Sequence, residues 1–393
     1  MTTTVPETAA GATTPGATTV ISEWSVLSPY GIGAEPFVEG VSARRPVVPR
    51  LNRDVWQAPG DACLVPGFDI VGLLGSRGTR TMDRLTGLTV ATLGTLLEPN
   101  GSRRRLDEPE HVGLVLGTGS GSVQSTMDFT RDALTGAKPF YVDPALFPNT
   151  VMNRAAGQSA IWYGLKGPNA TLAGGPLTGL QALRYATRLR ERGYSRTVLC
   201  GAVEEFSEQR AWLAWHTRGE ERRRTPLAEA CAMFLLEDAD TAQDAGRTPR
   251  ADILAVRFGA GPQGLRPALE RCVRSALEAA GTAPREVAFA APSGRVAPPP
   301  GTCPMGFGQR PSDADADDVE TVETAVLGDV LDGADVEYVG VRELLGDASA
   351  ASAGVQLAAV LAAAAHRPRP GAAAVVTSLD DDGLVACLVL RLR

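Results

Sequence analysis

The histidines come first, because an imidazole can move protons near neutral pH. The chain of 393 residues has three of them, His111, His216 and His366, far apart in the sequence. His111 precedes a predicted buried strand, His216 follows a predicted tryptophan-rich helix, and His366 lies in a predicted surface stretch of arginines and prolines. General acid–base catalysis needs a partner for the proton, and no such partner stands at a recognisable spacing. We expect no histidine of this chain to be catalytic.

The cysteines are the next candidates, since a thiolate is both a nucleophile and a zinc ligand. The six are scattered, with no CxxC pair and no histidine at ligand spacing; they are Cys63, Cys200, Cys231, Cys272, Cys303 and Cys387. Most have apolar neighbours, which indicates buried free thiols in a reducing cytoplasm and no metal site. The motifs GxSxG, HExxH and GxxxxGK[ST] do not occur in the sequence, so serine hydrolase, zinc protease and P-loop functions lack their motifs.

A glycine-rich run, Gly117–Ser122, follows the apolar segment Val112–Leu116. Dinucleotide binding would require a third glycine at position 122, which is serine, and an acidic residue about 20 positions further on. Asp143 matches that second requirement only loosely. The run is more typical of a tight turn between a strand and a helix. Dinucleotide binding stays open as a weaker alternative.

The overall composition narrows the function classes. The sums of 38 basic and 45 acidic residues give a net charge of −7, which argues against a nucleic-acid partner held through phosphate contacts. No stretch approaches 18 uninterrupted apolar residues, so we expect no membrane span. Residues 1–17 lack the basic and apolar regions of a signal peptide and are predicted to be a disordered tail.

The elements that must position any site alternate between strands and helices. Short apolar runs predict eight buried strands at Thr19–Glu23, Val112–Leu116, Thr197–Cys200, Ala232–Glu237, Ile253–Val256, Val287–Ala290, Ala373–Ser378 and Val385–Leu390. Apolar residues at helical spacing predict helices over Asp83–Leu97, Thr178–Arg192, Leu265–Ala280 and Ser352–Ala365. This alternation indicates an α/β fold with a mostly parallel or mixed sheet covered on both faces. Similar elements recur after about Ala251, so we expect two related halves, residues 18–250 and 251–393. The proline-rich, then acidic segment Arg295–Asp318 is predicted to be an irregular loop.

Nearly the whole chain resembles a ketosynthase of the thiolase superfamily. The segments that carry the resemblance are Val26–Gly33, Pro36–Gly40, Met82–Thr86, Val112–Ser122, Phe147–Thr150, Ala156–Gln158, Gly167–Thr171, Glu204 and Pro226–Glu237. They stand in the order and spacing of that family. The resemblance implies a thiolase fold, a duplicated αβαβα five-layer ketosynthase-like architecture.

The departures from the family pattern bear on function. The position of the nucleophilic cysteine is Pro176, and the positions of the two catalytic histidines are Ser293 and Asp347. The family's lysine corresponds to Arg342, and its gating loop corresponds to residues 379–383. Condensation needs a thiolate to hold the acyl chain and imidazoles to assist the reaction. We therefore expect that this chain cannot condense acyl groups alone.

A ketosynthase scaffold without its catalytic residues resembles the chain length factor of bacterial type II polyketide synthases. The resemblance implies a cytoplasmic heterodimer with an active ketosynthase subunit, whose acyl tunnel this chain would close at its far end. It implies no cofactor for this chain, while the partner would use acyl carrier protein with its phosphopantetheine. Members that make aromatic polyketides commonly have glutamine where this chain has Pro176, which hints at a reduced polyene product. Arg184, Arg188 and Arg190 are candidates to contact the carrier protein, although an ordinary solvated helix face explains them as well.

In that family, the helix after the glycine-rich turn faces the partner's tunnel. Here it would start near Val123, and Val123, Thr126 and Thr130 would share one face. These three are the predicted tunnel-lining residues, with ordinary interface residues as the alternative. Two further hypotheses stay open: a divergent thiolase-fold acyltransferase using its own nucleophile, such as Cys200 or Ser293, and a pseudoenzyme with an unrelated regulatory role.

Overall fold

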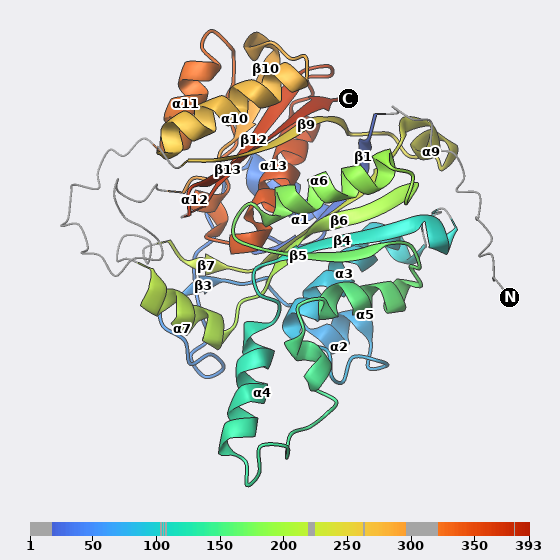
Figure 1. Ribbon diagram of the computed structural model, residues 1–393, viewed down its shortest axis with the longest axis vertical. Helices are drawn as coiled ribbons and strands as arrows, with labels where there is room; N and C mark the ends of the chain where they lie inside the picture. Colours follow the sequence, from blue (N-terminus) through green and yellow to red (C-terminus); the bar gives the residue numbers. More distant parts are fainter. Residues whose placement is uncertain are drawn as a thin grey trace, which may run out of the picture.

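The computed structural model describes residues 18–102, 104, 106, 108–218, 225–261, 264–295, 321–380 and 382–393 (Figure 1). The predicted disordered tail, most of the predicted loop at 295–318 and Cys303 lie outside these residues. The strands are β1 (Val20–Ser28), β2 (Gly31–Ile32), β3 (Ala62–Cys63), β4 (Val112–Thr118), β5 (Asn169–Ala173), β6 (Thr197–Glu204), β7 (Leu227–Ala228), β8 (Ala230–Glu237), β9 (Ala251–Ala260), β10 (Val287–Ala291), β11 (Glu337–Tyr338), β12 (Ala373–Leu379) and β13 (Leu384–Leu392).

Helices connect these strands. They are α1 (Ala34–Ser42), α2 (Ile70–Leu74), α3 (Arg84–Leu97), α4 (Val123–Thr135), α5 (Arg154–Tyr163), α6 (Thr178–Glu191), α7 (Glu208–Thr217), α9 (Ala239–Asp244), α10 (Leu265–Ala279), α11 (Val322–Val330), α12 (Arg342–Leu345) and α13 (Ser352–His366). All eight predicted strands and all four predicted helices are confirmed. The largest boundary difference is at β1, which continues to Ser28 because the segment stays buried beyond Glu23.

One mixed sheet runs through the described part of the molecule in the order β11-β10-β12-β13-β9-β1-β8-β6-β4-β5, with β2 beside β1. Each half contributes five main strands: β1, β4, β5, β6 and β8 in the N-terminal half, and β9 to β13 in the C-terminal half. When the five are numbered along the chain, both halves have them in the sheet order third, second, fourth, fifth, first. In both halves the first two pairings of that order are parallel and the last two antiparallel. The two halves join where β1 pairs with β9 at Val20 and Ile21. The topology is therefore duplicated, as predicted, while the exact boundary at residues 250 and 251 stays a prediction.

Five layers stack along the long axis (Figure 1). Helices α10 and α11 cover the outer face of the C-terminal half of the sheet, and α3 and α5 cover the outer face of the N-terminal half. Between the two halves lie α6 and α13, and α13 contacts strands of both. The segment Ser349–His366 is long and apolar enough to cross a membrane, but 72% of it is buried inside the molecule. Its apolar composition is thus explained by its place in the middle layer.

The two central helices approach each other at two glycines near their first turns. A Cβ atom added to Gly179 would lie 2.8 Å from the backbone nitrogen of Gly354. No side chain fits in that space, so glycine is required for the close contact between α6 and α13. This crossing brings together the N-terminal ends of the two helices that follow Pro176 and Asp347 in the chain.

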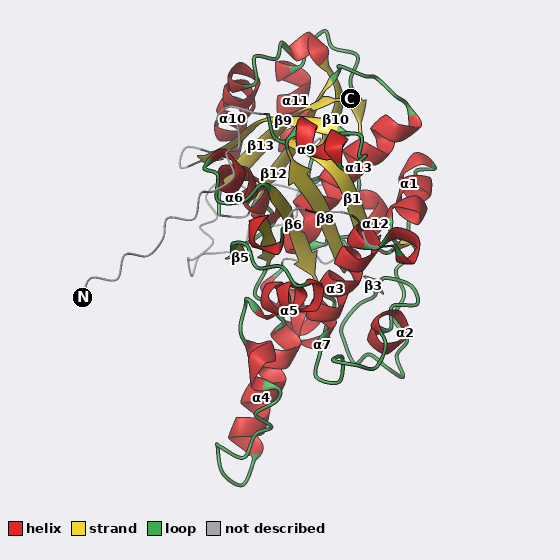
Figure 2. Ribbon diagram, turned by 90° about the vertical axis from the view of Figure 1, so that its right-hand side faces the viewer, coloured by secondary structure: helices red, strands yellow, loops and turns green. Residues whose placement is uncertain are grey.

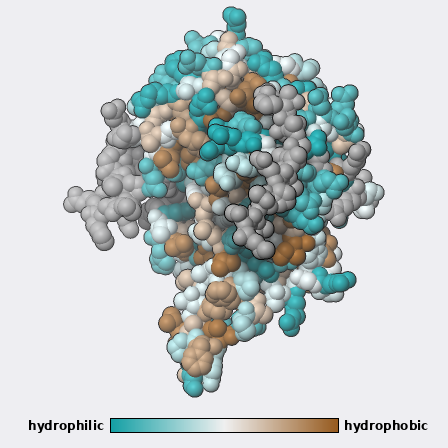
Figure 3. All heavy atoms as spheres, turned by 45° about the vertical axis from the view of Figure 1, so that its right-hand side comes forward, coloured by the Kyte–Doolittle hydropathy of each residue, from teal (hydrophilic) through white to brown (hydrophobic). Residues whose placement is uncertain are grey.

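The part of the chain from residue 123 to residue 152, which we call the arm, projects from the layered body (Figure 2). It comprises α4 and the segment that follows it. Its exposed apolar side chains are Met127, Leu134, Phe140, Tyr141, Leu146, Phe147, Val151 and Met152. Figure 3 shows hydrophobic surface gathered on this projection.

Candidate functional site

The three positions where the family has catalytic residues lie at the ends of elements around the middle layer. Pro176 stands two residues before α6, and Ser293 stands two residues after β10. Asp347 follows α12 and precedes the short 3-10 turn that leads into α13. Ser293 and Arg342 line one cavity, and Arg342 contacts Asp347. The structure thus brings Ser293 and Asp347 together through Arg342.

Pro176 is buried in the turn before α6 and offers neither a thiol nor a hydroxyl. The turn is closed by its own polar groups, because the backbone N–H and the hydroxyl of Thr178 both donate to the carbonyl oxygen of Gly175, at 3.1 and 2.7 Å. Gly175 faces Asp380, which belongs to the predicted gating-loop segment. Position 176 therefore supplies no covalent chemistry.

Asp347 is the centre of a cluster of positive charge. Its Oδ2 atom lies 2.9 Å from Arg218, 3.0 Å from Arg342 and 3.5 Å from Arg295. The backbone N–H of Ser349 also donates to its other carboxylate oxygen at 2.8 Å. Burial opposes ionisation, but the three guanidiniums outweigh it and hold the pKa of Asp347 well below its usual range. At the position where the sequence analysis expects the family's second histidine, this chain has an anion fixed in ion pairs.

Ser293 is also tied into a buried polar contact. Its hydroxyl donates to a carboxylate oxygen of Glu323 at 2.6 Å, and Thr377 donates to the other oxygen at 2.9 Å. Burial raises the pKa of Glu323, although hydrogen bonds from Ser293, Thr377 and Gly294 oppose the shift. The Ser293 hydroxyl thus has a carboxyl group as its hydrogen-bond partner.

The space at these positions is very small. The cavity lined by Ser293, Arg342, Gly346 and Gln356 has a volume of about 10 Å³, which is room for a single water at most. The amide of Gln356 closes its floor by donating to the carbonyl oxygens of Ala291 and Thr377, both at 2.8 Å. An acyl chain does not fit there.

The cysteines of the described residues are buried. Cys200 has no exposed surface, and burial raises the pKa of its thiol. Burial likewise raises the pKa of Cys63 and Cys272 to about 11 and that of Cys231 to about 12. Such thiols stay protonated at neutral pH and are inert. The structure therefore disfavours Cys200 as a nucleophile.

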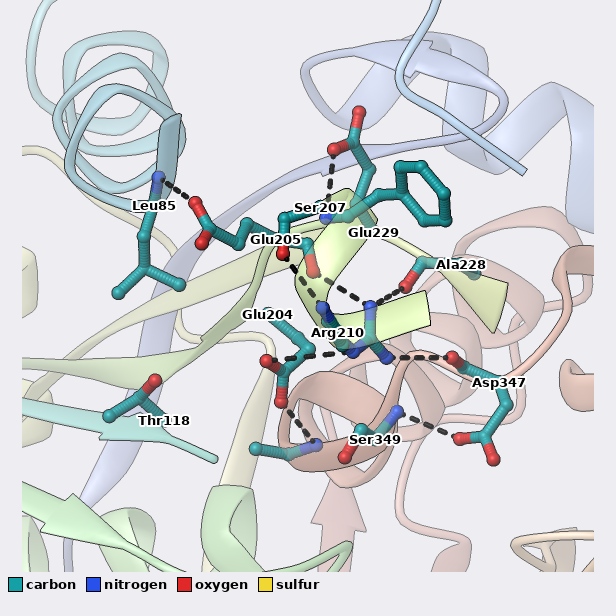
Figure 4. Close-up of polar contacts among 12 residues, drawn as sticks. Leu85, Thr118, Glu204, Glu205, Ser207, Arg210, Ala228, Glu229, Asp347 and Ser349 are labelled. Atoms are coloured by element: carbon teal, nitrogen blue, oxygen red, sulfur yellow. Dashed lines mark hydrogen bonds and ion pairs between the residues drawn. The ribbon is translucent and has the colours of Figure 1, made fainter. Parts of the chain in front are cut away.

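Arg210 is the centre of a buried network of hydrogen bonds and an ion pair (Figure 4), and the sequence predicted only one member of this network. The Arg210 guanidinium donates to the carbonyl oxygens of Glu205, Ala228 and Asp347 at 2.8, 2.9 and 3.2 Å, and lies 3.8 Å from the carboxylate of Glu204. The family pattern identified Glu204 alone. Arg210 lies on a helix with no apolar periodicity that would mark it as buried, so its role was missed.

The remaining predicted residues lie apart from this network. Val123, Thr126 and Thr130 lie on α4, whose first residue is Val123 as predicted; Val123 is half-buried, and the two threonines are exposed. Their role in a tunnel stays a prediction. Arg190 is buried and lies 3.7 Å from Asp238, so it cannot belong to an outer arginine face.

The glycine-rich turn after β4 fits the close-packing interpretation. A Cβ atom at Gly117 would lie 2.6 Å from the side chain of Thr178, and one at Gly119 would lie 2.6 Å from Glu204. The histidines are dispersed: His111 ends a 3-10 turn, His216 stacks on Trp212, and His366 ends α13.

Comparison with known proteins identifies relatives of the fold. Residues 8–242 match the family model described as "Beta-ketoacyl synthase, N-terminal domain". The chain is 26% identical over 215 residues to 3-oxoacyl-[acyl-carrier-protein] synthase 2 of Vibrio cholerae, which covers 50% of this chain and about half of that protein, 51%. It is 29% identical over 295 residues to a protein of Streptomyces halstedii named polyketide beta-ketoacyl synthase 2, covering 68% of this chain and 70% of the relative.

A solved structure described as the ishigamide ketosynthase/chain length factor is more similar. It superposes with a TM-score of 0.84 and is 38% identical, and the match covers 95% of this chain and 99% of the other. The thiolase-like fold of this chain therefore has a similar solved structure over nearly its whole length.

Proposed function

The chain belongs to the beta-ketoacyl synthase family, and from that membership we propose that it is the non-condensing subunit, the chain length factor, of a type II polyketide ketosynthase heterodimer. The observation that carries the proposal is the combination of a complete ketosynthase fold with Pro176 at the nucleophile position. Without a thiol there, no acyl-enzyme can form by the family's chemistry. The 10 Å³ cavity at Ser293 supports the same conclusion.

The arm supports pairing with another subunit. Soluble proteins rarely leave a large apolar patch exposed without a partner, and this arm presents Leu134 with 80% and Phe140 with 70% of its surface exposed. Within the described part of the chain, the nearby strand β5 pairs on one side only, with β4, so its other edge has backbone groups available for a further strand. We expect an obligate interface above about 2,000 Å² with the ketosynthase.

The proposed control of chain length lies on α4. Val123, Thr126 and Thr130 stand on the projecting helix, where a partner subunit would meet them. Small side chains there would leave more of the partner's tunnel open than aromatic ones, because packed volume is what stops a growing chain. The further assignment to a reduced polyene pathway is supported by Pro176 alone.

The proposed carrier protein, cofactor use and cellular location of this chain rest on its relatives and on its cysteines. The Vibrio cholerae protein is named for acyl carrier protein, and we propose that the ketosynthase partner of this chain takes acyl groups from such a carrier through its phosphopantetheine. This chain would need no cofactor. We propose a cytoplasmic location because the cysteines of the described part of the chain are free and buried.

To test this proposal, the heterodimer of this chain with its ketosynthase partner is reconstituted, and its products are analysed by mass spectrometry. Replacing Thr130 by Trp overpacks the tunnel end by about 1–3 kcal/mol, which slows late elongation roughly ten- to a hundredfold and shortens the product. Thr135→Trp is the matched control, since Thr135 lies on a different face of the same helix. An unchanged product length from an intact Thr130→Trp heterodimer would contradict the tunnel assignment.

A second candidate, an acyltransferase with Ser293 as nucleophile, is favoured by one observation. The Ser293 hydroxyl donates to Glu323 at 2.6 Å, so a base stands beside a potential nucleophile. Incubation of the chain with labelled acyl carrier protein, followed by peptide mapping, separates the two functions. The chain length factor predicts no labelled residue; stoichiometric label on Ser293 would establish the acyltransferase instead.

A further inference from the structure

A cavity of about 350 Å³ lies beside α7, between β7 and the loop that leads into β3. These three elements lie side by side on the left of Figure 1. Its apolar walls are Phe206, Ala211, Ala214, Trp215 and Leu227. The volume falls within the range of small-molecule sites, about 300–1,000 Å³. Its size and lining therefore suit a compact apolar body, unlike the closed space at Ser293.

Among the described residues that line this cavity, Arg218 is the one cation. Arg218 lies at the end of α7 and reaches Asp347 at 2.9 Å, so it connects the cavity to the charged cluster described above. Burial, together with the like charges of Arg210, Arg342 and Arg295, lowers the pKa of Arg218, against the attraction of Asp347. An anion in the cavity would relieve the repulsion that Arg218 experiences.

The acidic group at the rim does not reverse this charge. Asp61 also lines the cavity, but its carboxylate lies 2.9 Å from the guanidinium of Arg53 and accepts a hydrogen bond from the backbone N–H of Leu51. Its charge is thus compensated locally. The aromatic rings of Phe206 and Trp215 supply flat apolar surfaces, and Arg218 supplies the charged end.

From this arrangement we infer that the cavity beside α7 binds a small organic anion with a planar apolar body, whose carboxylate pairs with Arg218. The inference goes beyond the proposed chain length function and does not depend on it. No bond is made or broken in the complex. Because Arg218 lines the cavity and also pairs with Asp347, occupancy would add a negative charge beside the cluster around Asp347.

The test uses the heterodimer and 2-naphthoate as the probe, with 2-naphthamide as its uncharged counterpart, in calorimetric titrations. A charge-assisted pair to Arg218 should make naphthoate bind about tenfold tighter than naphthamide or more. Arg218→Met should remove that preference while naphthamide binding stays the same. Arg188→Met, which removes an exposed arginine of α6, is the matched control and should leave both affinities unchanged.

A second variant tests the cavity without touching the charge cluster. Ala214→Trp fills the space and should abolish binding of both probes while the thermal midpoint of unfolding changes little. Equal binding of the two probes, or naphthoate binding that survives both Arg218→Met and Ala214→Trp, would overturn the inference. If Arg218→Met does not fold, the Ala214→Trp titration decides the question alone.

Discussion

The two halves of the molecule share one strand order but differ in what is added to it. In the C-terminal half, β9 leads directly into α10, and β12 turns directly into β13. In the N-terminal half, the corresponding connections carry α1, β3 and α2 before α3, and α7 before β8. The arm is a further addition between β4 and β5. The shared scaffold thus holds the molecule together, while the additions of the N-terminal half supply the surfaces that could meet other molecules.

The site positions differ between the halves in the same way. The N-terminal position, Pro176, is neutral and closed by local backbone hydrogen bonds. The C-terminal position, Asp347, is charged and connects residues from α7, α12 and the segment after β10. The position in the N-terminal half is therefore a neutral turn, and the position in the C-terminal half is a buried ionic centre.

The close contact between the halves gives the largest expected effect. Gly179→Val places a side chain against the backbone of Gly354, where an added Cβ would already be 2.8 Å away. We expect a loss of about 4 kcal/mol or more in the free energy of unfolding, measured by chemical denaturation. Gly157→Ala in α5, where no atom lies within 4 Å of the added Cβ, should instead be neutral or stabilising. Equal stability of the two variants would show that the halves are not locked at this crossing.

Asp347 should contribute more to the free energy of unfolding than Pro176. Asp347→Asn leaves three guanidiniums without their shared anion and should cost about 3–5 kcal/mol, whereas Pro176→Ala should cost about 1 kcal/mol or less. The folded pKa of Asp347 is lowered, so its contribution is present above the unfolded value of about 3.9 and is lost as the pH falls below it. Denaturation curves at pH 7 and pH 3 measure both effects. The difference between the two variants should disappear if Asp347 contributes nothing.

Glu205 gives a smaller effect with the opposite pH dependence. Burial, helped by the charge of Asp83, raises its pKa to about 8. Its contribution to stability is therefore complete below the unfolded value of about 4.3 and is lost as the pH rises through 8. Glu205→Gln should be about 1–3 kcal/mol more stable than the parent at pH 9, with little difference at pH 5. Glu278→Gln, at an exposed position of α10, should show no such trend; a parallel trend there would contradict the assignment.

The smallest effect on folding is expected on the arm. Leu134→Asp changes a side chain that is 80% exposed, so the free energy of unfolding should change by less than about 0.5 kcal/mol. Its affinity for the ketosynthase, measured by analytical ultracentrifugation, should nevertheless fall at least about tenfold. Phe258→Asp, an exposed apolar position of the C-terminal half, should leave that affinity unchanged. Equal weakening by both would remove the arm from the interface.

Local patterns were enough to predict the scaffold. The eight strands and four helices follow from apolar runs and helical spacing, since each is buried along one or both faces. Strand β5 was missed because its five residues are exposed or half-buried and carry no apolar run. The tryptophan-rich helix expected before His216 is present as α7 (Glu208–Thr217), although no bounds were predicted for it. A five-residue strand without an apolar run gives no strand signal of its own.

The site could be predicted by position but not by its contacts. Family spacing placed Pro176, Ser293 and Asp347, yet it could not show that Asp347 pairs with Arg218, 129 residues away. Nor could it show that Glu323, 30 residues further along the chain, accepts a hydrogen bond from the Ser293 hydroxyl. These contacts depend on how the two halves meet, which no local window of sequence contains.

The position of β1 in the sheet has a consequence for synthesis of the chain. β1 lies between β8 and β9, and its Ser22 hydroxyl donates to Leu235, 213 residues later in the chain. At translation rates of roughly 5–20 residues per second, those 213 residues take roughly 10–40 s to appear. During that time the apolar first strand has neither neighbour. The nascent chain therefore has to be shielded from aggregation until its last N-terminal strand leaves the ribosome.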